Sequence, residues 1–142
     1  MPRRAEPPLL FVYGTLMRGE PAHRLLLGRA TFVEEGHTDG LLLDLGRFPG
    51  VIEGTGRVGG EVFRLERPEL LETLDDYEGY NFERSETAVT LASGRRARCW
   101  IYRYRETCGP SDRTPSTAHA VDHRVVRRKV IPEGHWRRFR WR

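Results

Sequence analysis

Apolar residues along the chain fall into short runs separated by glycine, proline and charged positions, a pattern that favours strands over long helices. The run LLFVYGT at residues 9–15 is almost wholly apolar before its glycine, so it predicts a buried strand. A hairpin that turns near Ser93-Gly94 is predicted over residues 83–105. Further extended segments are predicted at 30–45, 57–65 and 125–131, and the turn-rich segments 46–56 and 106–123 predict loops.

Two segments carry helix signals. Residues 21–28 begin with Pro21 and end at a glycine. Residues 67–79 have Pro68 in the first turn and Gly79 just past the end. Several strands with only two short helices predict an α+β fold rather than a doubly wound α/β sheet.

A carboxylate continues the apolar face of the second helix. Leu70, Leu74 and Glu78 are four residues apart and therefore share one face. A charge at this helix end meets the negative end of the helix dipole, and burial would raise the carboxyl pKa. Both effects suit a general acid or base near neutral pH. The same pattern also fits a last turn that directs Glu78 into solvent, which the residues taken alone favour.

The first strand ends in Tyr13-Gly14-Thr15-Leu16, a sequence with little bulk at its glycine. Successive backbone N–H groups in such a loop can converge on an anion, and Gly14 permits a positive φ and the close approach of a ligand. A plain strand-ending turn fits the same four residues.

Composition bounds the class of protein. The 142 residues are 38% hydrophobic and 31% charged, so we expect one globular domain over residues 1–142, with a short lead-in at 1–8. No apolar run approaches the roughly 18 residues of a membrane span, and the N-terminus lacks the features of a signal peptide. Two cysteines, Cys99 and Cys108, do not make a disulfide framework, so we expect a reducing cytoplasm and a buried structural Cys99.

The charge is uneven, because residues 124–142 hold eight arginine or lysine residues and one glutamate while the formal charge of the chain is +4. The basic tail at 137–142 interleaves aromatic and arginine residues, which could contact nucleic acid or another anionic surface. Alternatively, Trp136 packs on the barrel and the arginines are solvated. Since no nucleic-acid-binding module precedes the tail, we do not expect a nucleic-acid partner.

Other candidate chemistry is weaker. His119 and His123 have the spacing of a zinc pair with Cys108 upstream, but no closed four-ligand set is visible, so we expect no metal. Trp100, Tyr102 and Tyr104 occupy every second position and therefore share one strand face, which is typical of a barrel wall, and one of them could face a pocket.

The loop and helix motifs together resemble those of the γ-glutamylcyclotransferase-like, or AIG2-like, family. The similarity extends over about residues 9–136, through FVYGTLMRG, RFPGVI, VGGEVFRL, LDDYEGY and IPEGHW. It implies a small mixed β-barrel with a few flanking helices, and a cofactor-free, cytoplasmic enzyme. Such an enzyme cyclises a small-molecule γ-glutamyl substrate to 5-oxoproline and releases an amine or amino acid.

The resemblance also implies roles for particular residues. Glu78 would be the catalytic acid and base, and the loop Tyr13, Gly14, Thr15 and Leu16 would hold the substrate, with Tyr13 as a pocket wall. Many relatives have Tyr-x-Arg after the Glu-Gly turn, whereas this chain has Phe82-Glu83-Arg84. We therefore include Phe82 in the predicted substrate site, where it supplies no hydroxyl group unless Tyr80 does so instead. The sequence does not specify the identity of the leaving amine or the oligomeric state. The alternative is a non-catalytic protein of the same fold that binds a small ligand or a partner.

Overall fold

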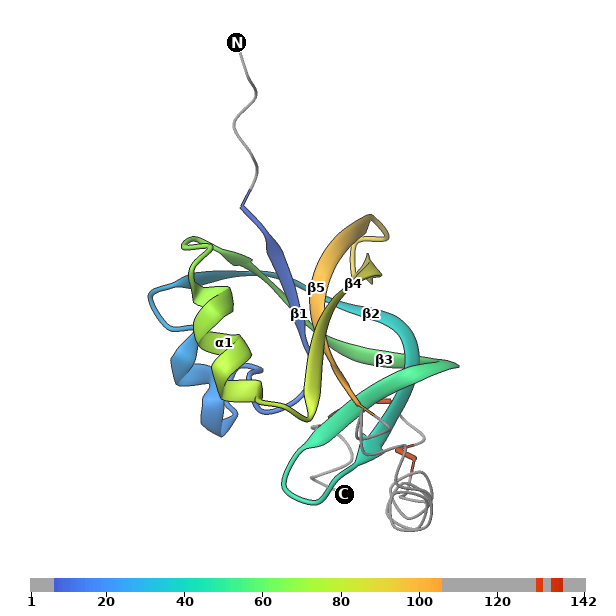
Figure 1. Cartoon of the computed structure of the whole chain (residues 1–142). Coiled ribbons are helices and arrows are strands. Elements are labelled where there is room, and N and C mark those ends of the chain that lie inside the picture. The colour runs from blue at the N-terminus through green and yellow to red at the C-terminus, as the bar shows by residue number, and fades with distance from the viewer. Residues whose placement is uncertain (1–6, 106–129, 132–133, 137–142) are drawn as a thin grey trace.

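The computed structural model describes residues 7–105, 130–131 and 134–136 (Figure 1). In these ranges, five strands close a mixed β-barrel in the order β1-β3-β2-β4-β5. The strands are β1 (Leu9–Val12), β2 (Ala30–Asp44), β3 (Pro49–Leu65), β4 (Phe82–Leu91) and β5 (Arg96–Tyr104). A short 3₁₀ helix, η1 (Pro21–Leu25), and one α-helix, α1 (Leu70–Glu78), lie on one side of the barrel (Figure 1). The predicted α+β barrel with flanking helices is confirmed.

The short strand β1 is the element that closes the barrel. It pairs antiparallel with β3, where Leu10 lies opposite Phe63, and parallel with β5, where Leu10 lies opposite Trp100. Leu10 and Phe11 are almost fully buried, as expected of a strand with neighbours on both edges. The chain therefore leaves β1 from inside the molecule, which brings the following loop, residues 13–20, against the barrel wall.

The predicted loop over residues 46–56 is confirmed only at residues 46–48, and the rest of the prediction is wrong, because Pro49–Leu65 forms one continuous strand, β3. Its glycines accommodate close neighbours instead of turning the chain. A Cβ atom on Gly50 would lie 2.8 Å from Tyr104, and one on Gly54 would overlap the side chain of Leu41. Glycine in a strand often marks such a close approach, so the glycine cluster was misinterpreted as a turn.

Both helices lie where they were predicted, but each is shorter than predicted. α1 begins at Leu70 rather than at residue 67, and Gly79 ends it with a φ of 77°. Residues 21–28 form a 3₁₀ helix only over Pro21–Leu25. Neither helix start has a side-chain cap hydrogen bond, and η1 begins with Pro21.

The remaining local predictions have mixed outcomes. The hairpin turn near Ser93-Gly94 is confirmed, with a φ of 96° at Gly94. Cys99 is buried as predicted, and burial raises the pKa of its thiol to about 12. Trp136 packs in the core. Of the strand predicted at 125–131, the structure describes only an isolated bridge between Leu43 and Val130.

Several predicted features lie outside the described residues: the loop at 106–123, the His119–His123 pair with Cys108, and the basic tail at 137–142. Within the part that is described, no helix has the length and apolar character needed to cross a membrane.

Candidate active site

A cavity of about 200 Å³ lies between the end of β1, the C-terminal end of α1 and the starts of β3 and β4. It is lined by residues 11–16, by Phe48 and Pro49, by Tyr77 and Glu78, and by Phe82 and Tyr102. All six residues of the predicted site therefore line one cavity: Glu78, Tyr13, Gly14, Thr15, Leu16 and Phe82. Elements far apart in the sequence meet here because the barrel closes through β1.

Glu78 is the acidic residue of this cavity lining. Leu70 and Leu74 are buried under the same helix face, so the last turn of α1 directs Glu78 to the cavity rather than to open solvent. Burial raises the pKa of the Glu78 carboxyl to about 7. Among the described residues, no hydrogen bond or ion pair reaches this carboxyl to oppose that effect. Glu78 can thus take up or release a proton near neutral pH.

Tyr13 forms a fixed wall of the cavity. Its hydroxyl donates to the carbonyl oxygen of Tyr102 at 2.6 Å and accepts from the amide of Val51 at 3.3 Å. Burial, with a smaller contribution from the nearby Glu78, raises the pKa of the Tyr13 hydroxyl far above its ordinary value. Both of these hydrogen bonds are internal, so Tyr13 joins three segments of the barrel at the cavity.

Gly14 serves the loop in a different way from the one predicted. Its φ is not positive. A Cβ atom there would instead lie 2.7 Å from Cγ of Pro49, so the missing side chain lets β3 approach the loop. The chain thus does not use the positive φ that glycine permits at this position, and the close neighbour that the structure shows is Pro49.

Three residues of the cavity lining, Gly14, Thr15 and Leu16, come from the loop that follows β1. In the described part of the chain, the N–H groups of Gly14, Thr15 and Leu16 have no hydrogen-bond acceptor. Loop amides that lie near a cavity and lack internal acceptors are suited to bind an anion or a polarised carbonyl oxygen. The Oγ1 atom of Thr15 lies 3.5 Å from the hydroxyl of Tyr77, which joins the loop to α1 across the cavity.

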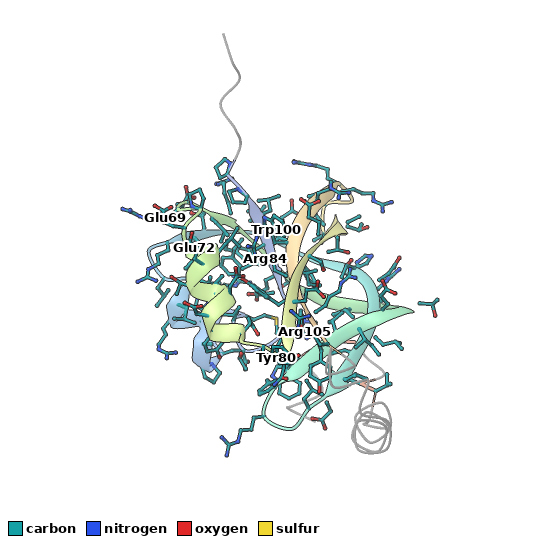
Figure 2. The ribbon with its side chains drawn as sticks, in the orientation of Figure 1. Glu69, Glu72, Tyr80, Arg84, Trp100 and Arg105 are labelled. Atoms are coloured by element: carbon teal, nitrogen blue, oxygen red, sulfur yellow. The ribbon has the colours of Figure 1, made fainter. Side chains whose placement is uncertain are left out.

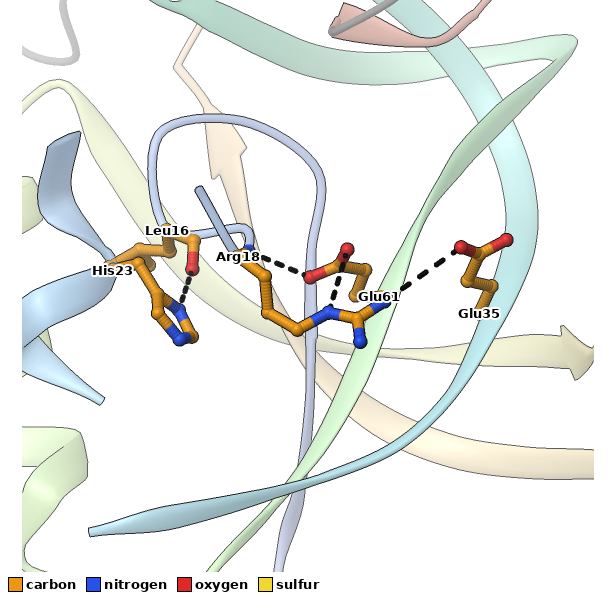
Figure 3. Close-up of polar contacts among 5 residues, drawn as sticks. All are labelled: Leu16, Arg18, His23, Glu35 and Glu61. Carbon is orange, nitrogen blue, oxygen red and sulfur yellow. Dashed lines mark hydrogen bonds and ion pairs between the residues drawn. The ribbon is translucent and has the colours of Figure 1, made fainter. Parts of the chain in front are cut away.

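A buried carboxylate of β3 forms hydrogen bonds to the loop that follows β1 (Figure 3). Glu61, only 2% exposed, accepts the backbone N–H of Arg18 at 2.9 Å and its Nε at 3.3 Å. The carbonyl of Leu16 lies 2.9 Å from Nδ1 of His23 (Figure 3). The loop conformation is therefore set before any ligand binds. Sequence reasoning missed Glu61, because its neighbours along the chain are those of an ordinary strand.

Asp75, a second carboxylate of α1, differs from Glu78 because both of its oxygens accept hydrogen bonds. It accepts Nε and an Nη of Arg84 at 2.9 and 3.1 Å and the hydroxyl of Tyr102 at 2.6 Å. Burial of Asp75 raises its pKa, but the hydrogen bonds from Arg84 and Tyr102 outweigh that effect and leave the pKa below its ordinary value. Arg84 also lies over the ring of Trp100, with its Cζ 4.5 Å from the ring centroid (Figure 2). These contacts of Asp75 fix α1 on the β4–β5 hairpin.

Tyr80 does not replace the missing tyrosine hydroxyl at Phe82. It is 62% exposed, and its carbonyl accepts Nε of Arg105, whose guanidinium lies near the Tyr80 ring (Figure 2). Tyr80 does not line the cavity, whereas Phe82 does. This wall of the cavity is therefore apolar. In the described ranges, no group of three or more histidine, cysteine, aspartate or glutamate side chains could hold a metal ion.

The protein is a small closed barrel whose cavity is lined by one carboxyl with a pKa of about 7 and by a loop whose amides have no acceptor among the described residues. Comparison with known proteins identifies the family of this barrel. Residues 10–138 match the family model described as gamma-glutamyl cyclotransferase, AIG2-like. The chain belongs to this family of enzymes.

Individual relatives agree with the family match. A Vibrio cholerae relative is 36% identical over 100 residues, which cover 70% of this chain and 84% of the relative. The gamma-glutamylaminecyclotransferase of Rattus norvegicus is 30% identical over 119 residues, covering 66% of this chain and 75% of that protein. The crystal structure of an AIG2-like protein from Mus musculus superposes with a TM-score of 0.62 at 28% identity, covering 70% of this chain and 78% of that one.

Proposed function

We propose that this protein cyclises the γ-glutamyl group of a small molecule to 5-oxoproline and releases an amine or amino acid, with Glu78 as the general acid and base. The observation that carries the proposal is the position of Glu78, whose carboxyl lines the cavity and has a pKa of about 7. A group with this pKa is populated in both protonation states near neutral pH, as a proton carrier needs to be.

The reaction needs no second substrate. The α-amine nitrogen of the γ-glutamyl group attacks the γ-carbonyl carbon, a C–N bond forms, and the five-membered lactam closes as the original amide C–N bond breaks. The α-nitrogen loses a proton and the departing nitrogen gains one. Glu78 takes the first proton and donates the second, so it ends the cycle in its starting state.

The loop supplies the second element of the proposed mechanism. Gly14, Thr15 and Leu16 line the cavity, and their backbone amides have no acceptor among the described residues. In the proposed mechanism these amides hold the substrate carboxylate or the oxygen that gains negative charge in the transition state. Because Glu61 and Tyr13 fix the loop and its surroundings, little reorganisation is needed when charge develops. Closing the chain of the substrate on itself within a small cavity adds the advantage of proximity.

The apolar walls suit the uncharged part of the substrate. Phe82 and Tyr13 would pack on the methylene groups between the α-carbon and the γ-carbonyl. Excluding water from these faces strengthens the electrostatic contribution of the amides and favours attack by the internal amine over hydrolysis.

The test is 5-oxoproline release from γ-glutamyl amino acids, γ-glutamylamines and glutathione by wild type and by Glu78→Gln. We expect the substitution to lower kcat/KM by about 100-fold or more, the range of general acid–base catalysis. Glu72→Gln is the matched control, because Glu72 is exposed on the same helix and lies outside the cavity lining (Figure 2). Full turnover by Glu78→Gln would refute the proposed mechanism, and no release from any compound would refute the proposed activity.

A further inference from the structure

A second cavity lies beside the β2–β3 ladder, and its described lining shares no residue with the candidate active site. Its volume is about 280 Å³, close to the roughly 300 Å³ at which the range of small-molecule sites begins. Three of its described lining residues have side chains that donate hydrogen bonds: His37, Arg57 and His135. The mechanism proposed above uses none of these three.

The register of β2 and β3 places the charged groups beside this cavity in a fixed order. Three pairs of residues lie opposite one another along the ladder: Glu35 and Glu61, His37 and Gly59, and Asp39 and Arg57. Directly opposite residues of an antiparallel pair share a face, and so do residues two apart on one strand. The carboxylates of Glu35 and Glu61 are therefore at one end of this face, Arg57 is at the other, and His37 lies between them.

The acidic end of this face has a partner within the chain. Glu35 pairs with Nη2 of Arg18 at 3.9 Å, and Nε of the same guanidinium donates to Glu61 at 3.3 Å (Figure 3). At the other end, the Arg57 guanidinium makes no hydrogen bond or ion pair with any residue that the structure describes, although Asp39 lies opposite it in the ladder. The Arg57 end of the cavity therefore has a positive charge available to a ligand.

Two glycines place the His135 ring in this cavity. A Cβ atom on Gly59 would lie 2.8 Å from Cδ2 of His135, so a side chain at Gly59 would displace the ring. The N–H of Gly59 donates to the carbonyl of Gly134 at 2.7 Å, and a Cβ atom on Gly134 would overlap the carbonyl of Arg57. The His135 ring thus lies against Gly59, the residue that His37 faces across the ladder.

From this geometry we propose that the second cavity binds a small oxyanion, a phosphate or a carboxylate group, between the Arg57 guanidinium and the imidazoles of His37 and His135. A guanidinium offers two parallel N–H donors that match the oxygens of such a group. Each neutral imidazole adds one N–H donor, so the three side chains together can reach more than one oxygen of the ligand. The proposal does not rest on the reaction proposed above, since the two cavities have separate linings.

NMR titration of the whole ¹⁵N-labelled chain at pH 7 tests this proposal. Sodium phosphate and sodium succinate are the two probes, and sodium chloride at equal ionic strength is the reference. We expect saturable shifts, absent with chloride, in signals of the cavity lining: the amides of Gly36, Gly59 and Gly60 and the imidazoles of His37 and His135. The probe that binds more tightly identifies the ligand group as a phosphate or a carboxylate.

Two variants and a control assign the binding to these side chains. Arg57→Ala should raise the dissociation constant of the bound probe by about tenfold or more, because it removes the charged donor. Gly59→Ala should raise it by about threefold or more, because the new Cβ atom displaces the His135 ring. The matched control is Arg95→Ala, which should leave the dissociation constant unchanged, since Arg95 is also exposed but does not line the cavity.

The proposal is overturned if neither probe shifts the signals of the cavity lining beyond the chloride reference, or if Arg57→Ala leaves the dissociation constant unchanged. Shifts confined to the amides of Gly14, Thr15 and Leu16 would also overturn it, because the anion would then bind in the candidate active site. None of these results bears on the proposed activity, which has its own test in Glu78→Gln.

Discussion

Replacing Glu78 with glutamine should stabilise the folded protein, and the gain should depend on pH. Burial raises the carboxyl pKa from its ordinary value of 4.5 to about 7 in the folded chain. Below pH 4.5 the group is protonated whether the chain is folded or unfolded, so it has no linked effect. Between pH 4.5 and 7 the unfolded chain ionises first, and stability therefore falls as pH rises. Above pH 7 the full cost of the buried charge is present.

The size of this cost follows from the two pKa values. At about 1.36 kcal/mol per pKa unit, a rise from 4.5 to about 7 corresponds to an upper limit of about 3 kcal/mol. Because Glu78 is only half-buried at a solvent-connected cavity, screening reduces the expected value to about 2 kcal/mol. Glutamine has a similar shape and no charge, so Glu78→Gln should recover this free energy at pH 8.5 and almost none of it at pH 4.

Urea denaturation at pH 4, 5.5, 7 and 8.5 measures the difference directly, with circular dichroism as the signal. For a chain of 142 residues, a gain of about 2 kcal/mol corresponds to a rise of about 5–8 °C in Tm. The control Glu72→Gln removes a carboxylate from the exposed face of α1 and should stay within about 0.5 kcal/mol of wild type at each pH.

The reasoning fails if the stability difference between Glu78→Gln and wild type is the same at pH 4 and pH 8.5. It also fails if Glu78→Gln becomes less stable than wild type as pH rises, since that would mean that the Glu78 carboxylate of the wild type has a favourable partner in the folded state. Either result would remove the physical basis for a near-neutral pKa at Glu78, independently of any activity.

Three further predictions concern the structure around Glu78. Tyr13→Phe leaves a buried carbonyl and a buried amide without their hydroxyl partner and should cost about 1–3 kcal/mol in urea denaturation. Gly14→Ala places a Cβ atom 2.7 Å from Pro49, so it should cost about 1–3 kcal/mol and lower 5-oxoproline release by displacing the loop. Asp75→Asn removes the charge that Arg84 binds and should cost about 1–2 kcal/mol at pH 7. Since folding lowers the Asp75 pKa from its ordinary value of 3.8, the contribution of Asp75 is present above that value and is lost as pH falls through the lower folded-state pKa, so the cost of Asp75→Asn should shrink as the solution is made more acidic than pH 3.8.

The local sequence pattern predicted the structure correctly where a helix end or a hairpin turn requires the backbone conformation of glycine. Gly79 ends α1 with a positive φ, and Gly94 turns the last hairpin, both as predicted. The glycines of residues 50–56 were wrongly interpreted as loop residues, because glycine can either turn the chain, as Gly46 does, or make room for a close neighbour. At Gly50 and Gly54 the second use applies, and only the partner strands and side chains around them decide this.

The sequence by itself determined that α1 ends at Gly79 with Glu78 in line with Leu70 and Leu74, and that an apolar strand runs into the loop at 13–16. These features depend on local backbone preferences and helical periodicity, which neighbours along the chain specify. Tertiary structure alone decided that the loop and the end of α1 meet at one cavity, because that requires β1 to close the barrel. It also decided the pKa of Glu78, since desolvation depends on every side chain packed around the carboxyl and on none of them singly.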